Sequence, residues 1–311
     1  MRAVKVKASD VQGEMVTHGV PASAAPQEDT LSRTRGRVRR DVIGVPIDAL
    51  SWDQALGTLR EWSARRDSKV VCIVNAHSLA LAREDSGFRQ VLAESDMATP
   101  DGMPVVWMLR CPGAKGQARI DGPELMWRYC AEAARRGDSI FLYGSTEDTL
   151  ARLCEKLRAA FPELRIAGTH SPPFRPLNTE EDRAVVRAIN ASGAGLVFVG
   201  LGCPRQERWM REHRGHVRAV MVGVGAAFDF HAGIVRRAPT WMRSIGLEWL
   251  FRLGQEPRRL WRRYLTYNTR FMAHAVMQLA GLGRSWPRKS PGTSIESDLP
   301  RNERNALSNK K

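Results

Sequence analysis

Asp101 is the residue whose type and position in the sequence most favour chemistry. It stands in TPDG, residues 99–102, where a short predicted strand gives way to a predicted helix. An aspartate directly before a helix commonly caps the first turn by accepting a hydrogen bond from it. An aspartate at the carboxyl end of a strand is also placed to remove a proton from a substrate, as a general base does. The spacing favours the cap and leaves the general base open.

Three more polar residues stand where a predicted strand ends or a predicted helix begins. Asn75 ends the strand in IVNAHS, Arg119 opens RIDGPEL, and Asp229 lies between two phenylalanines in AAFDFHAG. Each has an ordinary explanation, which is a helix cap for the asparagine, an ion pair with Asp121 for the arginine, and a hydrogen-bonded turn for the aspartate. Ligands of open α/β sheets bind beyond the carboxyl ends of the strands. The shared position of these residues therefore predicts a pocket there.

Two glycine turns follow the last strong strands of the sequence. They are GLG at residues 200–202, within VFVGLGCPRQERWM, and GVG at residues 223–225. Glycines after a strand are typical of phosphate-binding turns. Neither turn completes the G-x-G-x-x-G pattern, because Arg205 and Phe228 stand where the third glycine would be. The turns are compatible with a nucleotide site, and they argue against a nicotinamide-dependent dehydrogenase, whose motif follows the first strand.

The elements that must position these residues alternate between strand and helix patterns. Strands are predicted over residues 41–47, 69–75, 96–100, 139–144, 164–170, 195–202 and 218–225, and helices over 52–66, 78–85, 87–95, 103–110, 122–136, 146–161 and 179–192. Ser51 and Gln54 form a capping box for the first helix, and Thr179 is the predicted N-cap of the last. This alternation predicts an α/β fold with a mostly parallel sheet and helices on both faces.

The pattern changes near the end of the chain, where it becomes helical only. We predict an α/β domain over residues 41–245 and a helical appendage over residues 246–283. The polar segments 1–40 and 284–311 are predicted to be disordered extensions. In the appendage, leucines and tryptophans interleave with arginines, which is typical of an amphipathic helix at an anionic membrane. A helical subdomain with solvated arginines has the same composition.

The charge of the chain is strongly positive and concentrated near the appendage. The net charge is +15, with 48 Lys and Arg residues against 33 Asp and Glu residues. Nine arginines stand at positions 236, 237, 243, 252, 258, 259, 262, 263 and 270. Such a charge favours an anionic partner, which could be a nucleic acid, a membrane or a phosphorylated substrate.

The cysteines and histidines predict neither a disulfide framework nor a metal site. Five cysteines form no C-x-x-C pair, and three of them lie in apolar segments, so reduced and buried thiols are predicted. His213 and His216 share a helical spacing but have no carboxylate partner in the pattern, so we predict surface residues rather than metal ligands. The N-terminal segment carries no secretory signal, and no stretch reaches the roughly 18 apolar residues that span a bilayer. A soluble or surface-bound protein is therefore predicted.

Together, the motifs resemble the WecG/TagA/CpsF glycosyltransferase family. The likeness runs in order through VNAHSLALA, TPDGMPVVW, RIDGPEL, FLYGS, VGLGCPRQERWM, GVGAAFDFHAGIVRRAP and GLEWLFRLGQEPRRLWRRYL. The resemblance implies a Rossmann-like catalytic domain with a helical C-terminal appendage. It also implies an inverting transferase without metal or cofactor, which moves a sugar from a UDP-sugar to a polyprenyl-diphosphate-linked sugar in exopolysaccharide or other cell-envelope polysaccharide synthesis. The expected location is peripheral, on the cytoplasmic face of the plasma membrane.

The resemblance also assigns roles by position. It makes Asp101 the general base rather than a cap. It places five residues in the substrate pocket, namely Asn75, Arg119, Gly202, Gln206 and Asp229. It assigns three arginines of the appendage to the diphosphate or to lipid phosphate, namely Arg252, Arg259 and Arg262. The expected partners are the UDP-sugar, the lipid-linked acceptor and an anionic membrane, with no nucleic acid and with a homo-oligomer left open.

One position departs from the family pattern. Ile73 stands where some members have threonine, which argues against close identity with the teichoic-acid branch. The sequence leaves open the donor sugar, the acceptor sugar and the pathway. Two alternatives to an enzyme remain at this point: a basic nucleic-acid-binding protein, and a non-catalytic component of an envelope assembly.

Overall fold

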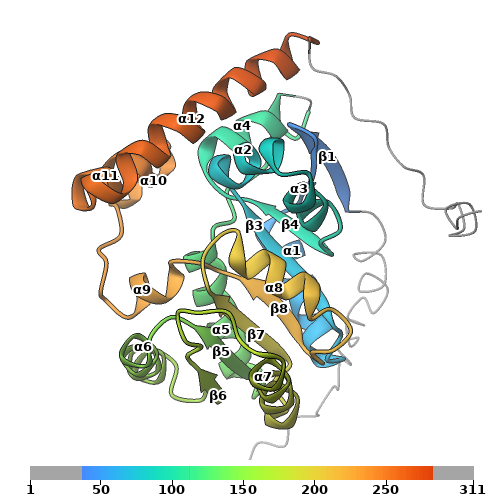
Figure 1. Cartoon of the computed structure of the whole chain (residues 1–311), viewed down its shortest axis with the longest axis vertical. Coiled ribbons are helices and arrows are strands. Elements are labelled where there is room, and N and C mark those ends of the chain that lie inside the picture. The colour runs from blue at the N-terminus through green and yellow to red at the C-terminus, as the bar shows by residue number, and fades with distance from the viewer. Residues whose placement is uncertain (1–36, 112, 283–311) are drawn as a thin grey trace, which may run out of the picture. The chain divides into compact units, whose positions relative to one another are not determined.

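The computed structural model describes residues 37–111 and 113–282, and the fold is the predicted α/β class. A six-stranded sheet, in which every neighbouring pair is parallel, has the strand order β4-β3-β8-β7-β5-β6 (Figure 1). The strands are β3 (Lys69–Val74), β4 (Met97–Pro100), β5 (Ser139–Gly144), β6 (Arg165–His170), β7 (Leu196–Gly200) and β8 (Val220–Gly223). The predicted Rossmann-like architecture is therefore confirmed.

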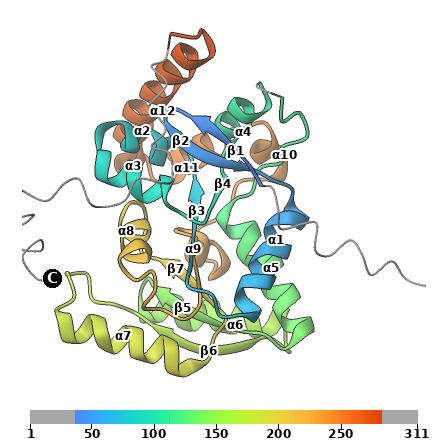
Figure 2. The same cartoon turned by 90° about the vertical axis from the view of Figure 1, so that its right-hand side faces the viewer.

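Helices cover both faces of this sheet (Figures 1 and 2). One face carries α2 (Ala76–Glu84), α3 (Ser86–Ala93), α7 (Thr179–Ser192) and α8 (Arg205–Glu212), and the other carries α1 (Trp52–Ala64), α5 (Gly122–Arg136) and α6 (Glu147–Ala160). Successive residues of a strand point to opposite faces. Val70 and Cys72 accordingly pack in one core and Val71 and Ile73 in the other. The strands are buried on both sides and therefore read as continuous apolar runs.

The helix boundaries follow local capping. Ser51 and Gln54 form the predicted capping box of α1, and α5 has its predicted bounds between the Asp121 cap and Gly137, whose φ is 72°. The predicted cap of α7 is wrong by one residue. Asn178 caps the helix, because its Oδ1 accepts from the N–H of Glu181 at 2.9 Å while the Glu181 carboxylate accepts from the N–H of Asn178 at 2.9 Å.

The segment before α1 is a hairpin, where the sequence predicted a single strand over residues 41–47. Strands β1 (Val38–Val42) and β2 (Val45–Ala49) pair antiparallel, and the turn residues Ile43 and Gly44 have φ values of 54° and 83°. Two positive φ values in a two-residue turn match the twist of the flanking strands. Strand β1 also includes residues 38–40 of the predicted N-terminal extension. The rest of both predicted extensions, apart from residue 37, lies outside the described residues.

His213 corrects another prediction. It is buried rather than on the surface, with Nε2 3.0 Å from an Asp182 carboxylate oxygen and Nδ1 2.7 Å from the Trp209 carbonyl oxygen. The contact ties α8 to α7, across 31 residues of sequence. His216 is exposed, as predicted. All five cysteines are free of disulfides, and those at 72, 130 and 154 are buried.

In the described chain, four helices follow the last strand, β8, and three of them lie after residue 239. These three are α10 (Thr240–Ser244), α11 (Glu248–Gln255) and α12 (Pro257–Leu279), preceded by the short helix α9 (Ala227–His231). Helix α12 lies across α2 (Figure 1), where Phe271 and Ala275 are buried and Tyr267 meets His77 with ring centroids 4.4 Å apart. Within the described chain, neither the 23-residue α12 nor any shorter helix is long and apolar enough to cross a membrane.

Candidate active site

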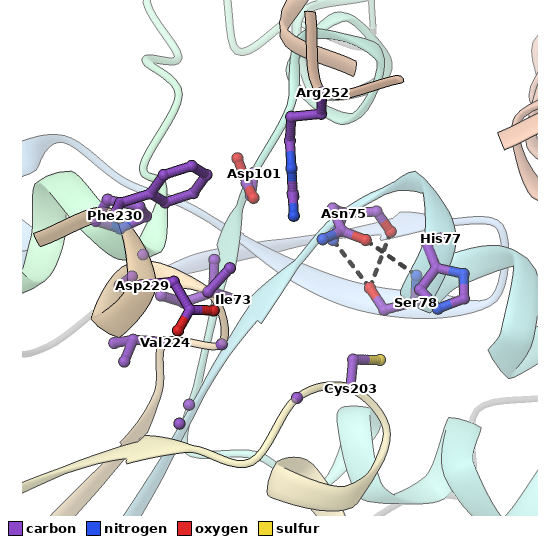
Figure 3. A pocket seen from close by; sticks show the side chains of 18 of the residues that line it. Ile73, Asn75, His77, Ser78, Asp101, Cys203, Val224, Asp229, Phe230 and Arg252 are labelled. Atoms are coloured by element: carbon purple, nitrogen blue, oxygen red, sulfur yellow. Dashed lines mark hydrogen bonds between the residues drawn. The ribbon is translucent and has the colours of Figure 1, made fainter. Parts of the chain in front are cut away.

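A cavity of about 840 Å³ opens at the carboxyl ends of the strands (Figure 3). Five of the six strands contribute a residue that follows them: Asn75 after β3, Asp101 after β4, Ser145 after β5, Gly202 after β7 and Gly225 after β8. From β3 the chain continues to the edge strand β4, and from β5 it continues to β6 at the opposite edge of the sheet. A crevice opens at the carboxyl ends of the strands where the strand order reverses in this way. The volume falls within the range of ligand pockets, about 300–1,000 Å³.

Asp101 lines this cavity and does not cap α4 (Met103–Arg110). The N-cap of that helix is Gly102, with φ 81°, and it offers no side chain. The Asp101 N–H instead donates to the Val74 carbonyl at 2.8 Å, which extends the β3–β4 pairing by one bond. Its carboxylate accepts from Arg119, with 2.9 Å between Nε and Oδ1. The cap interpretation is therefore wrong, and the carboxylate remains available at the cavity wall.

Arg119 is shared among carboxylates from three parts of the chain. Beyond Asp101, its Nη2 lies 2.6 Å from Glu248 Oε2 on α11, and its Nε lies 3.7 Å from Asp121 Oδ2. Asp121 also pairs with Arg237 and caps α5. The simple Arg119–Asp121 pair considered from the sequence is therefore the weakest of the three contacts by distance.

The cluster shifts the pKa of both partners of the central pair. Burial raises the pKa of the Asp101 carboxyl above its ordinary value; Asp121 and Glu248 add to this, and Arg119 opposes it. Burial lowers the pKa of Arg119, but the three carboxylates outweigh it and hold that pKa above its usual range. Arg119 therefore stays a cation, and Asp101 is a stronger base than a solvated aspartate.

Asn75 has the structural role that the sequence suggested and also lines the cavity. Its Oδ1 accepts from the Ser78 N–H at 3.1 Å, and its N–H donates to the Ser78 hydroxyl at 2.9 Å, a reciprocal cap at the start of α2 (Figure 3). The cap fixes the asparagine at the end of β3. Ile73, two residues earlier, lines the cavity as well.

Gln206 fastens the two glycine turns together. Its Oε1 accepts from the N–H groups of Gly202 and Gly225, at 3.2 and 3.1 Å, and its Nε2 donates to Glu207 Oε1 at 2.8 Å. Both glycines have positive φ, which side chains rarely adopt. These two N–H groups are therefore engaged by a side chain, and they hold the turns rather than face the cavity.

The α11–α12 part of the chain supplies the remaining wall. Its cavity-lining residues are Glu248, Trp249, Arg252, Leu260 and Tyr264. Arg252 extends into the cavity from α11 (Figure 3), with its guanidinium carbon 5.4 Å from the centroid of the Phe230 ring. The neighbouring helix α9 contributes Asp229, which also lines the cavity.

The other two predicted arginines differ from Arg252. Arg262 is exposed on α12, 5.2 Å from the centroid of the Trp261 ring, and is not among the described residues that line the cavity. Arg259 belongs to the first turns of α12, and its side chain lies outside the described atoms. Of the predicted site residues, the structure thus gathers Asp101, Asn75, Arg119, Gly202, Gln206, Asp229 and Arg252 around one cavity.

The cavity is lined by two glutamates that the sequence did not single out as site residues. Glu248 stands in the quoted GLEW motif, but its partners Arg119 and Arg237 are remote in the sequence. Glu207 is buried, and this burial raises the pKa of its carboxyl. Neither is marked by a spacing rule. Among the described residues, no group of three His, Cys, Asp or Glu side chains is arranged to hold a metal ion.

Known proteins resemble this chain over most of its length. The model of the glycosyl transferase WecG/TagA/CpsF family matches residues 40–285. N-acetylglucosaminyldiphosphoundecaprenol N-acetyl-beta-D-mannosaminyltransferase from Bacillus subtilis (strain 168) is 34% identical over 199 residues, which cover 63% of this chain and 75% of the relative. The chain therefore belongs to the WecG/TagA/CpsF family and is a glycosyltransferase.

Proposed function

We propose that this glycosyltransferase moves a sugar from a UDP-sugar to a polyprenyl-diphosphate-linked sugar, with inversion and without a metal ion. The observation that carries the proposal is the Asp101–Arg119 pair at the end of β4, in a cavity that Arg252 also lines. A displacement that releases an anionic group requires a base for the attacking hydroxyl and a cation near the leaving group, and this cavity has both.

In this reaction Asp101 is the general base. Its carboxylate takes the proton of the acceptor hydroxyl as that oxygen attacks the anomeric carbon. The bond from this carbon to the diphosphate oxygen breaks on the opposite side of the sugar, and UDP leaves with the bonding electrons. A single displacement of this kind inverts the configuration. The raised pKa of Asp101 strengthens it as a base for this transfer.

The charge that develops on the leaving diphosphate needs donors. Arg252 is a cation that extends into the cavity from α11. In the described chain the N-cap residues of α4 and α8, Gly102 and Pro204, make no side-chain cap. At the start of α8 the Gln206 N–H already donates to the Gly202 carbonyl at 3.0 Å. Backbone N–H groups at a helix start that have no partner within the helix attract phosphate oxygens. We assign the diphosphate to this side of the cavity, together with Arg252.

The Bacillus subtilis relative guides the choice of acceptor. Its name specifies N-acetylglucosaminyl-diphospho-undecaprenol as the acceptor and N-acetyl-β-D-mannosamine as the sugar added. We propose the same class of lipid-linked acceptor for this chain. The sugar that is transferred is left open, since Ile73 lines the cavity where some members have threonine.

We also propose that α10–α12 rest on an anionic membrane surface, with the enzyme peripheral on the inner face of the plasma membrane. Helix α12 has an inner stripe at Leu260, Phe271 and Ala275, which is buried. A second stripe is exposed, and it consists of Trp261 (47%), Leu265 (65%), Met272 (49%), Val276 (60%) and Leu279 (56%). Exposed apolar residues at helical spacing beside arginines suit a lipid headgroup region.

The test of the activity is an assay with purified protein, N-acetylglucosaminyl-diphospho-lipid and a panel of UDP-sugars, with and without EDTA. We expect transfer from one UDP-sugar, undiminished by EDTA, with release of UDP and inverted configuration at the anomeric carbon by NMR. Retention of configuration, or a requirement for a divalent metal, would contradict the mechanism. The lipid surface is tested separately by flotation with vesicles that contain or lack anionic lipid, with duplex DNA as a competing polyanion.

A further inference from the structure

Glu248 joins the appendage to the base through Arg119. It is the first residue of α11, and its side chain is only 15% exposed. Its Oε2 lies 2.6 Å from Arg119 Nη2, and its Oε1 lies 4.0 Å from Arg237 Nε. Both arginines belong to the part of the chain before α10. One carboxylate of α11 thus faces two cations of the catalytic domain.

The start of α11 lies close against α4. Gly246, two residues before Glu248, has φ 82°, and a Cβ added there would lie 3.0 Å from Met103 Cβ. Met103 is the first residue of α4, directly after the Asp101–Gly102 turn. The close approach at Gly246 therefore delivers Glu248 to the same corner of the cavity as Asp101.

Arg119 lies between two carboxylates that hold different ends of its guanidinium. Asp101 accepts from Nε at 2.9 Å, and Glu248 faces Nη2 at 2.6 Å. An arginine held at one nitrogen can still turn about its side-chain bonds, because the side chain has several rotatable torsions. An ion pair at a second nitrogen restricts this rotation, and so restricts the direction from which Arg119 faces Asp101.

We propose that Glu248 is a positioning residue that holds Arg119 against Asp101, so that the general base is oriented only while α11 is docked on the catalytic domain. The inference rests on the proposed role of Asp101. Helix α11 also carries Arg252 into the cavity. Docking of one helix therefore supplies the cation for the leaving group and completes the support of the base.

Several charged groups face Asp101, and their balance gives the proposal a pH signature. Arg119 and Asp121 come from the segment before α5, Glu248 comes from α11, and Arg237 neutralises part of the charge of Asp121. Removing the negative charge of Glu248 lowers the pKa of Asp101, because a like charge nearby disfavours the ionised form. The acid limb of the rate profile, where the base becomes protonated, then moves to lower pH.

The test compares Glu248→Gln with wild type and with Glu212→Gln, which removes an exposed carboxylate on α8. We expect Glu248→Gln to lower kcat by about 10- to 100-fold, as small misplacements of catalytic groups do. UDP affinity by calorimetry should be unchanged or tighter, since the cavity loses a negative charge. The acid limb of kcat/KM should move to lower pH. Glu212→Gln should match wild type in all three.

A second variant separates the effect of the Glu248 charge from the effect of its side-chain length. Glu248→Asp keeps the negative charge and shortens the side chain, so its acid limb should stay near that of wild type while kcat remains reduced. Parallel losses of kcat and UDP affinity in Glu248→Gln, with an unmoved acid limb, would make Glu248 a structural contact and overturn the proposal. Unchanged kcat would overturn it as well. A failure of the proposed function itself looks different, because wild type would then transfer no sugar or Asp101→Asn would retain full turnover.

Discussion

The strand-end wall of the cavity and the α11 wall are held in place by different kinds of contact. At the strand ends, Gln206 and Glu207 are 4% and 1% exposed, and the Gln206 amide bonds to two backbone turns and to its neighbour. Helix α11 contains no buried residue, and its contacts with the α/β part of the chain include the ion pairs of Glu248 and the ring contact of Arg252. One wall is part of the core, and the other is a surface helix laid against it.

This difference predicts how each wall responds to substitution. Loss of a buried hydrogen-bonding group leaves partners without water or protein contacts, so folding stability falls together with activity. When a partly exposed side chain is lost, water takes its place as a partner, so binding or rate changes while folding stability does not. Substitutions on the two walls therefore separate effects on folding stability from effects on binding or rate.

The largest effect is expected at the junction of the two walls, for Asp101→Asn. Loss of the base should lower kcat by about 10²- to 10⁴-fold, because an amide cannot take the acceptor proton. UDP affinity, measured by calorimetry, should stay close to that of wild type. Asp148→Asn, at an exposed position on α6, is the matched control. Normal turnover by Asp101→Asn would remove Asp101 as the base.

On the strand-end wall, Gln206→Leu should lower the free energy of unfolding by about 1–3 kcal/mol, because one buried and two partly buried groups lose their hydrogen-bond partner. The groups are the N–H of Gly202, the N–H of Gly225 and the Glu207 carboxyl. Chemical denaturation measures this loss, and the transfer assay should show reduced activity at the same time. Full stability with lost activity would mean that Gln206 acts on substrate rather than on the turns.

The pH dependence of wild type comes next in size. Asp101 must be ionised to act, so kcat/KM should fall as the pH drops through its pKa, by about tenfold per pH unit below it. Burial raises this pKa above the ordinary aspartate value of 3.8, so the limb should lie above that value. A profile that stays flat down to pH 4 would contradict the raised pKa.

On the α11 wall, Arg252→Ala should weaken UDP binding by about tenfold or more, the usual worth of a hydrogen bond to a charged group. The melting temperature should not change, because the Arg252 side chain is partly exposed. Its ring contact with Phe230 is made at the cavity surface. Arg258→Ala, which removes an exposed arginine near the start of α12, serves as the control. A lower melting temperature for Arg252→Ala would erase the distinction between the walls.

The smallest effect is expected away from both walls, for Leu265→Ser. This residue is 65% exposed on the outer stripe of α12. Loss of its apolar surface should weaken flotation with anionic vesicles by about three- to tenfold. Transfer to a water-soluble acceptor analogue should be unaffected. Val38→Ser changes a 54% exposed aliphatic residue on β1 and should leave vesicle binding as it is.

The sequence predicted the elements with strong local signals. The bounds of α5 are correct because Asp121 and Gly137 mark its two ends. The hairpin was missed because Ile43 is apolar and looks like part of a continuous strand, although its φ is positive. The cap of α7 was placed at Thr179 because both it and Asn178 suit the position, and only the bond to Glu181 decides between them.

The site residues could be predicted from the sequence where they stand near the predicted end of a strand. Asp101, Asn75 and Gln206 each follow or flank a strand end, and the parallel sheet brings these ends together. Glu248 could not be found in this way, because its position depends on how α11 docks and its partner is 129 residues away. The sequence left open whether Asp101 caps α4 or acts as a base. The structure decides this locally, since Gly102, the residue that follows, takes the N-cap position.

The seating of α12 has a consequence for biosynthesis. Gln278 accepts from the Ile43 N–H at 2.7 Å and donates to the Asp41 carbonyl at 2.9 Å, so two segments 235 residues or more apart close on each other. Translation delivers the hairpin and α2 long before Phe271 and Ala275, which cover them. A nascent chain that has emerged only as far as α10 therefore exposes the apolar face of α2 and lacks the cavity wall that α11 and α12 supply. Transiently exposed apolar surface of this kind is prone to aggregation until the covering helix is made.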